Sequence, residues 1–236
     1  MGETGDMERL TDYSDERNRG FCAYCGGSTE TRDHVPSRIL LDPPYPIDLP
    51  VVPACQDCNR SFSLDEEYLA CLVECAVVGS VDAASLRRDK IKSIITRKPA
   101  LASRIRNARI RDLFGQVSFR AEPDRVRNVV LKLARGHAAF ELGEPRLEQP
   151  ARIAFAPLET MATPVREDFE APSITTIWPE VGSRAMQRMA VAFPYCYGPD
   201  WVEVQPERYR YLTSVSEGVV IRMVLSEYLG CEVVWV

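Results

Sequence analysis

The sequence predicts an α+β protein with three successive parts: an N-terminal zinc module, a set of basic helices, and an antiparallel α+β domain at the C-terminus. Three observations lead to this prediction. Four cysteines near the N-terminus form two Cys-x-x-Cys pairs. Residues 80–114 carry apolar side chains at helical spacing, with Lys and Arg on the polar side. After Pro150 the chain changes to short β-like runs separated by turn residues.

The two cysteine pairs predict a structural zinc site. Cys22 and Cys25 form one pair, Cys55 and Cys58 form the other, and 29 residues lie between the pairs. Thiolates two residues apart on a tight turn occupy two corners of a tetrahedron, so two such turns complete a four-cysteine site. Buried free cysteines or disulfides are the alternative. The repeated spacing and the lack of a visible signal peptide favour zinc.

A second group of candidate residues lies between and just after the cysteine pairs. The segment Thr31-Arg32-Asp33-His34-Val35-Pro36 falls inside the gap, and Asn59 follows Cys58 directly. This order, over about residues 19–75, resembles the HNH endonucleases of the ββα-metal, treble-clef type. Within them it is most similar to the zinc-knuckle branch with an endonuclease VII-like active site. The resemblance implies a treble-clef module that hydrolyses DNA phosphodiester bonds.

The resemblance also implies a role for each candidate residue. His34 would be the general base, since a neutral imidazole can take a proton from water near neutral pH. Asp33 and Asn59 would hold Mg²⁺ or Mn²⁺, which prefer oxygen ligands. Asp48 stands where the pattern has its middle asparagine, and it cannot donate a hydrogen bond as an amide does. Because Asp33 and His34 are adjacent on an expected strand, a twist or bulge is needed for both to serve one site.

Positive charge is concentrated in the middle of the chain. Between Arg87 and Arg135 there are 15 basic and four acidic side chains, whereas the rest of the chain has 14 basic and 30 acidic ones. A solvated helix face is the simple explanation, but the two expected helices, 80–98 and 99–114, have too few acids to neutralise it. We expect phosphate contacts from Arg60 and from the basic residues of these helices: Arg87, Arg88, Lys90, Lys92, Arg104, Arg106 and Arg109.

The sequence suggests four segments along the chain: an acidic tail or cap (1–18), the zinc-binding HNH module (19–78), a basic helical segment (79–115) and an α+β domain (116–236). The role of the last segment stays open between target recognition, dimerisation, ligand sensing and a purely structural scaffold. Its long helix carries His137, which we expect to be a hydrogen-bonded core residue. We expect strands at 116–121, 151–157, 173–178, 189–193, 201–205, 209–214, 219–225 and 231–236.

The expected function is therefore that of a metal-dependent DNA endonuclease, with restriction or phage defence as its setting. The alternative is a non-catalytic, zinc-dependent nucleic-acid-binding module, which Asp48 keeps open. DNA, or RNA, is the expected partner. A homodimer would supply two sites for a double-strand break, and a regulatory partner or ligand could act at the C-terminal domain. No apolar run approaches the length of about 18 residues that a membrane helix needs, so we expect a cytoplasmic protein with no membrane contact.

Overall fold

The computed structural model describes four stretches of the chain, residues 10–14, 20–172, 177–192 and 201–236. The chain forms two compact units, of which unit 1 comprises residues 1–61 and 130–236 and unit 2 comprises residues 62–129. These units divide the chain at other points than the four segments expected from the sequence. The cysteine-bearing segment groups with the C-terminal part of the chain. Of the expected tail, only residues 10–14 are described.

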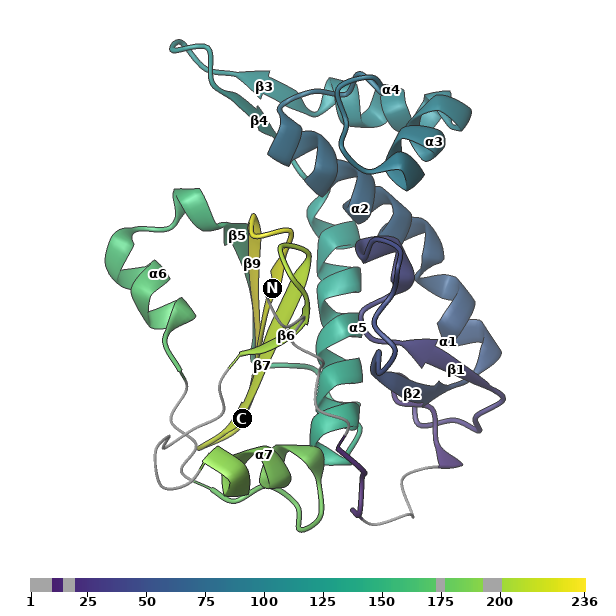
Figure 1. Ribbon diagram of the computed structural model, residues 1–236, viewed down its shortest axis with the longest axis vertical. Helices are drawn as coiled ribbons and strands as arrows, with labels where there is room; N and C mark the ends of the chain where they lie inside the picture. Colours follow the sequence, from purple (N-terminus) through teal and green to yellow (C-terminus); the bar gives the residue numbers. More distant parts are fainter. Residues whose placement is uncertain (1–9, 15–19, 173–176, 193–200) are drawn as a thin grey trace, which may run out of the picture. The chain divides into compact units, whose positions relative to one another are not determined.

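Unit 1 contains a five-stranded antiparallel sheet (Figure 1). Its spatial order is β5-β9-β8-β7-β6, with bounds β5 (Arg152–Pro157), β6 (Val202–Gln205), β7 (Tyr209–Val215), β8 (Val219–Leu225) and β9 (Leu229–Trp235). These strands are rich in β-branched and aromatic residues, which suit a pleated, half-buried surface. The short segments η3 (Leu158–Thr160) and α6 (Thr163–Glu170) follow β5. The chain is a mixture of helix and antiparallel sheet, as the sequence predicts.

One expected strand is wrong, and another cannot be compared. Residues 189–193 were expected to be extended, but Arg184–Ala192 form helix α7. This segment is rich in Ala, Met and Arg, which favour helix, and Ser183 Oγ accepts a hydrogen bond from the Met186 N–H at the start of the helix. The expected strand at 173–178 lies largely outside the described residues.

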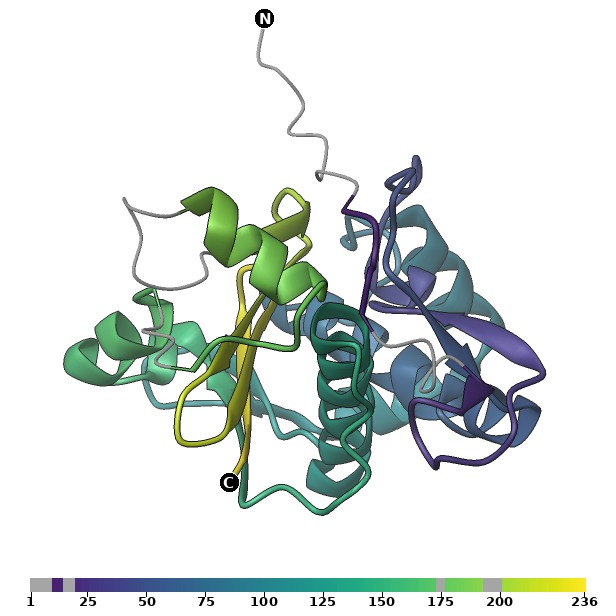
Figure 2. The same cartoon turned by 90° about the horizontal axis from the view of Figure 1, so that it is seen from below.

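Helix α5 (Pro123–Leu142) contributes its residues 130–142 to unit 1, where they lie between the sheet and a small hairpin (Figures 1 and 2). Toward the sheet, the His137 ring stacks on Tyr211 with centroids 3.8 Å apart, and its Nε2 lies 2.8 Å from the Tyr209 hydroxyl oxygen. His137 is thus the hydrogen-bonded core residue that the sequence predicts. Toward the hairpin, a Cβ added at Gly136 would lie 2.6 Å from Val35 Cγ2. The helix and the hairpin therefore approach closely there.

That hairpin consists of β1 (Thr31–His34) and β2 (Val51–Ala54), which pair in antiparallel register. Segment η2 (Arg38–Leu40) and a proline-rich loop join the strands, and helix α1 (Gln56–Ser61) follows β2. The loop is tied to the sheet at Asp42. Its N–H donates to Gln205 Oε1 at 2.8 Å, its carbonyl accepts from Gln205 Nε2 at 2.8 Å, and its carboxylate pairs with Arg208.

Unit 2 is mainly helical, with α2 (Ser63–Val78), α3 (Asp89–Arg97), α4 (Pro99–Asn107) and a hairpin of β3 (Arg109–Arg111) and β4 (Val117–Phe119). The first residues of α5 complete it. Cys71 and Cys75 of α2 are core residues: both are fully buried, and burial raises the pKa of each thiol to about 12. No helix in the described stretches has the length and apolar character needed to span a lipid bilayer.

The two helices expected at 80–98 and 99–114 are shorter in the structure. The first begins only at Asp89, because the Glu74 carboxylate accepts hydrogen bonds from the N–H groups of Arg87 and Arg88 and holds that stretch as a turn. The second ends at Asn107, and the remaining residues form the β3–β4 hairpin. Gly115, with a positive φ of 82°, allows the tight turn of this hairpin.

Candidate functional site

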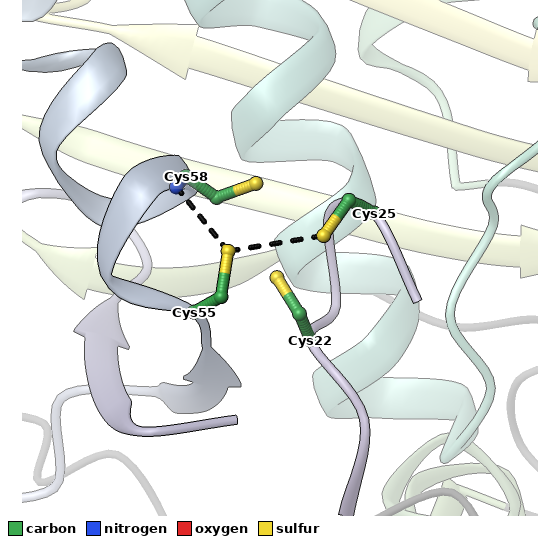
Figure 3. A group of neighbouring side chains, drawn as sticks. All are labelled: Cys22, Cys25, Cys55 and Cys58. Atoms are coloured by element: carbon green, nitrogen blue, oxygen red, sulfur yellow. Dashed lines mark hydrogen bonds between the residues drawn. The ribbon is translucent and has the colours of Figure 1, made fainter. Parts of the chain in front are cut away.

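The four predicted zinc ligands form one cluster. The Sγ atoms of Cys22, Cys25, Cys55 and Cys58 all lie within 4.8 Å of one another, and Cys25 Sγ is 3.8 Å from Cys55 Sγ. Figure 3 shows the sulfurs of Cys22 and Cys25 from one loop facing those of Cys55 and Cys58 at the start of α1. A tetrahedron with Zn–S bonds of about 2.3 Å has sulfur–sulfur edges of about 3.8 Å. The cluster therefore has the ligand type and the spacing that a zinc ion requires.

Backbone hydrogen bonds hold each cysteine pair in a tight turn. In the first turn, the Gly26 N–H donates to the Cys22 carbonyl at 2.9 Å, and the Cys22 N–H donates to the Gly27 carbonyl at 2.7 Å. Gly26 has a positive φ of 72°, which is why a glycine suits this position. In the second turn, the Cys58 N–H points at Cys55 Sγ over 3.3 Å. Amide groups directed at the sulfurs stabilise thiolates.

The electrostatics of the cluster also suit a cation. Burial raises the pKa of the Cys22 thiol, but N–H groups of Cys55, Tyr24 and Cys25 outweigh it, so that this pKa is lowered. Burial and the neighbouring sulfurs raise the pKa of Cys58 well above its usual range. Several negative sulfurs in one small space repel each other, and a divalent cation removes that cost.

Asp33 lies in a buried polar cluster. The residue is only 8% exposed, and its Oδ2 receives a hydrogen bond from the Tyr24 hydroxyl at 2.8 Å. Lys132 Nζ, on α5, lies 2.6 Å from the same oxygen and donates to Ser37 Oγ at 2.8 Å. Among the described residues, both contacts of the carboxylate fall on Oδ2, so Oδ1 is the oxygen that a cation could use.

His34 is half-buried at the end of β1, and its Nδ1 is buried without a hydrogen-bond partner in the described part of the chain. Burial lowers the pKa of its imidazole, the positive charges of Arg38 and Lys132 lower it further, and Asp33 opposes the shift. The imidazole is thus neutral at pH 7, the state in which it can accept a proton.

Asn59 reaches from α1 to β1. Its Nδ2 lies 3.1 Å from Thr31 Oγ1 and 3.3 Å from the Arg32 carbonyl oxygen. Thr31 and Asp33 are two positions apart on the strand and therefore share one face. The amide of Asn59 consequently faces the side of β1 that carries the Asp33 carboxylate.

The third member of the predicted triad lies on the other face. The β1–β2 register runs without interruption from Thr31 opposite Ala54 to His34 opposite Val51. Adjacent residues of a regular strand point to opposite sides. Of the twist or bulge that the sequence predicts, the bulge is therefore absent from this hairpin, and only a twist remains. Asn59 contacts Thr31 on the face of β1 that also carries Asp33, and the regular pairing puts His34 on the opposite face. Asp48 is half-buried in the turn before β2, and Arg60 is exposed on α1.

The predicted phosphate-binding residues of unit 2 fall into two groups. Arg88 is 4% exposed at the start of α3, so its expected place on a basic surface is wrong. Arg87, Arg104, Arg106 and Arg109 are exposed, and Lys90 and Lys92 are partly exposed. Some of these side chains have protein partners, since Lys92 pairs with Asp89 at 2.9 Å, Arg104 with Glu122 at 3.5 Å, and Arg109 donates to the Gly79 carbonyl.

Lys132 is the site residue that the sequence argument missed. It was counted only as one charge of the basic region. The sequence feature that could have revealed its role is its position in α5 between Val129, Val130 and Leu133, all of which are fully buried. A lysine within an apolar helix face needs a buried anion, and Asp33 was a candidate for that anion.

A hollow of about 890 Å³ lies in unit 1 against Thr31, Arg32 and the end of α5, lined also by Asp12 and Arg184. Asp33, His34 and Asn59 do not line it, so it is separate from the candidate site. Comparisons of the chain with models of protein families, with curated proteins and with solved structures gave no match.

Proposed function

We propose that this chain is a metal-dependent endonuclease of the HNH type that hydrolyses DNA phosphodiester bonds, built on a treble-clef zinc module. The observation that carries the proposal is the contact of Asn59 with β1. Asn59 follows the zinc-ligand candidate Cys58, and its amide bonds to the strand that bears Asp33 and His34. The β-hairpin and the helix that begins at the second cysteine pair thus carry the residues that the HNH resemblance assigns to catalysis, with His34 on the face of β1 opposite Asp33.

His34 acts as the general base in this proposal. Its lowered pKa keeps the imidazole neutral, so that it can take the proton from an attacking water. Nδ1 is buried without a protein partner among the described residues, so Nε2 is the ring nitrogen that an attacking water could reach. A nitrogen of the ring is available to accept the proton.

Asp33 Oδ1 and Asn59 Oδ1 are the atoms that would hold Mg²⁺ or Mn²⁺, because hard divalent cations take carboxylate and amide oxygens. Bound there, the ion would supply positive charge for the phosphorane and for the leaving oxygen. Tyr24 and Lys132 fix the Asp33 carboxylate by way of Oδ2 and so present the second oxygen in a defined direction.

The test is cleavage of supercoiled plasmid by the zinc-loaded protein with added Mg²⁺ or Mn²⁺. We expect nicking that needs the added cation, and a loss of about 10²- to 10⁴-fold in His34→Ala. Asp33→Asn and Asn59→Ala should raise the Mg²⁺ concentration needed for half-maximal activity. Val165→Ala, at an exposed position of α6 outside the site, is the control for general effects of purification. Cleavage by His34→Ala at the wild-type rate would refute the assignment of the base.

One observation favours a second function, a non-catalytic zinc-dependent nucleic-acid-binding module. The charge of Asp33 is already balanced by Lys132, and this lowers its attraction for a second cation. This alternative requires salt-sensitive DNA binding without turnover in Mg²⁺, Mn²⁺, Ca²⁺, Ni²⁺ or Zn²⁺. Any cation-dependent cleavage that disappears in His34→Ala excludes it.

A further inference from the structure

The β3–β4 hairpin of unit 2 ends in two large apolar side chains that face solvent. Leu113 and Phe114 are 102% and 92% exposed. Single exposed apolar residues are common on protein surfaces, but two adjacent, fully exposed ones at the end of a projection indicate a partner. In Figure 1 the turn of this hairpin points away from α3 and α4.

Hydrogen bonds hold the turn in one shape. Asp112 Oδ1 accepts from the N–H groups of Phe114 at 2.8 Å and Gln116 at 2.9 Å. The Gly115 N–H donates to the Asp112 carbonyl at 3.1 Å, and the Asp112 N–H donates to the Gln116 carbonyl at 3.0 Å. The backbone under Leu113 and Phe114 is therefore ordered, and both side chains are presented outward without a loss of conformational freedom in the main chain on binding.

Arginines surround this apolar end. From Arg104 to Arg120 the chain has five arginines, no lysine and one acid, Asp112, whose carboxylate is used in the turn. Arg111 is directly opposite Val117 in the hairpin. At the base of the hairpin, the Arg120 N–H donates a hydrogen bond to the Ala108 carbonyl. Arg106, Arg111 and Arg120 are exposed, and none of them has an ion pair with another described residue.

A cleft of about 720 Å³ lies at the base of the hairpin. Its lining includes Arg104, Asn107, Ile110, Arg120 and Arg125. Arg104 is near Glu122, but the 3.5 Å pair is half-exposed and weak, so that its guanidinium can exchange partners. The cleft thus continues the arginine-rich surface from the hairpin to α4.

We infer that the β3–β4 hairpin is a DNA wedge: it enters the minor groove of duplex DNA, inserts Leu113 and Phe114 at a base step and bends the duplex, while Arg111 and Arg120 contact the flanking phosphates. Apolar side chains that unstack a base step, accompanied by arginines, are the chemistry by which proteins bend DNA from the minor groove. The exclusive use of arginine fits planar contacts to phosphate and to a narrow groove better than general attraction to an anionic surface. The inference rests on the proposed function in that duplex DNA is the ligand of both.

The experiment uses the full zinc-loaded chain without added Mg²⁺ or Mn²⁺, and a short duplex labelled at both ends for energy transfer. Wild-type protein should bind the duplex and shorten the end-to-end distance. Leu113→Ser/Phe114→Ser should abolish the shortening and weaken binding by about tenfold, the order expected when stacking on a base is lost. Val181→Ser replaces a side chain of unit 1 that is 78% exposed, and it should change neither quantity. Arg111→Ala/Arg120→Ala should keep the bend at low salt and lower the slope of log K against log salt by about two.

The outcomes separate this inference from the nuclease proposal. Bending that depends on Leu113 and Phe114, in a protein that cleaves no DNA with any cation, supports the wedge and refutes the nuclease. Cleavage with an unchanged bend and affinity in the double serine variant refutes the wedge and leaves the nuclease standing. The wedge is also overturned if the double variant loses binding to anionic lipid vesicles or loses self-association while its DNA affinity is unchanged.

Discussion

The Lys132 ammonium nitrogen lies 2.6 Å from Asp33 Oδ2, and the two side chains are 1% and 11% exposed. The pair joins α5 to β1 inside unit 1. Tyr24 and Ser37 satisfy further hydrogen bonds of these two groups. A buried ion pair is stable only when its distances and hydrogen bonds compensate for the loss of hydration. Removal of one partner leaves the other as a buried charge without compensation.

Lys132→Met should lower the free energy of unfolding by about 3–5 kcal/mol, because Asp33 would then be a buried, unpaired carboxylate. Asp33→Asn in the same chain should restore a large part of the loss. Urea denaturation measures both. Lys98→Met is the matched control, since its pair with Glu67 is half-exposed and should contribute less than about 1 kcal/mol. Equal losses in the two lysine variants would contradict the role of the buried pair.

Cys55→Ser should release zinc and unfold the hairpin region of unit 1, because structural zinc contributes on the order of 10 kcal/mol to small domains. Metal content and thermal melting of the purified variant measure this. Cys71→Ser changes a buried cysteine of unit 2 that is not in the cluster, and it should keep the wild-type zinc content. Wild-type zinc content and melting in Cys55→Ser would exclude the four-cysteine site.

Gly136→Ala should destabilise the protein by about 1–3 kcal/mol, because the new methyl group would lie 2.6 Å from Val35 Cγ2 and 2.9 Å from its Cγ1. The loss should be smaller when Val35→Ala is already present, since the two side chains compete for one space. A double-mutant cycle in urea measures this coupling. Additive effects would show that the helix and the hairpin do not meet at Gly136.

The stability of the protein should fall with pH below about 6.5 because of His137. Burial lowers the pKa of its ring to about 3, whereas the ring of the unfolded chain titrates near 6.5. Between these values the unfolded state binds a proton that the folded state does not bind. As the pH falls from about 6.5 toward 3, the free energy of unfolding therefore decreases by up to about 1.4 kcal/mol for each pH unit. Above about pH 6.5, His137 contributes no change of stability with pH.

His137→Phe removes this proton uptake and keeps the stacking on Tyr211. The variant should be less stable than the wild type at pH 8, because the Tyr209 hydroxyl loses its partner, and the difference should shrink as the pH falls. Urea titrations at several pH values give the two curves. Parallel curves would mean that His137 is not the group responsible.

Local signals were sufficient for the cysteine cluster and for most strands of the sheet. The cysteine spacing restricts the turn geometry by itself, and β8 has the bounds that the sequence predicts. The pairing of Asp33 with Lys132 depends on tertiary packing across many positions, which residue spacing does not reveal. Strand β4 lies within the strand expected at 116–121, but β3 was missed because Ile105 and Ile110 resemble one helix face, although Asp112 and Gly115 were turn signals. The burial of Arg88 was also missed, because the polarity of a side chain alone does not predict whether it is buried.

The contacts of Asp42 with Gln205 and Arg208 have a consequence for work with fragments. A shortened protein that ends after α2 would keep every residue of the HNH-like motif, yet it would lack the side chains that anchor the proline-rich loop and the lysine that neutralises Asp33. An inactive fragment would therefore report the loss of these supports and would say nothing against the motif. Excision or transplantation of the site would have to carry the sheet and the second half of α5 with it.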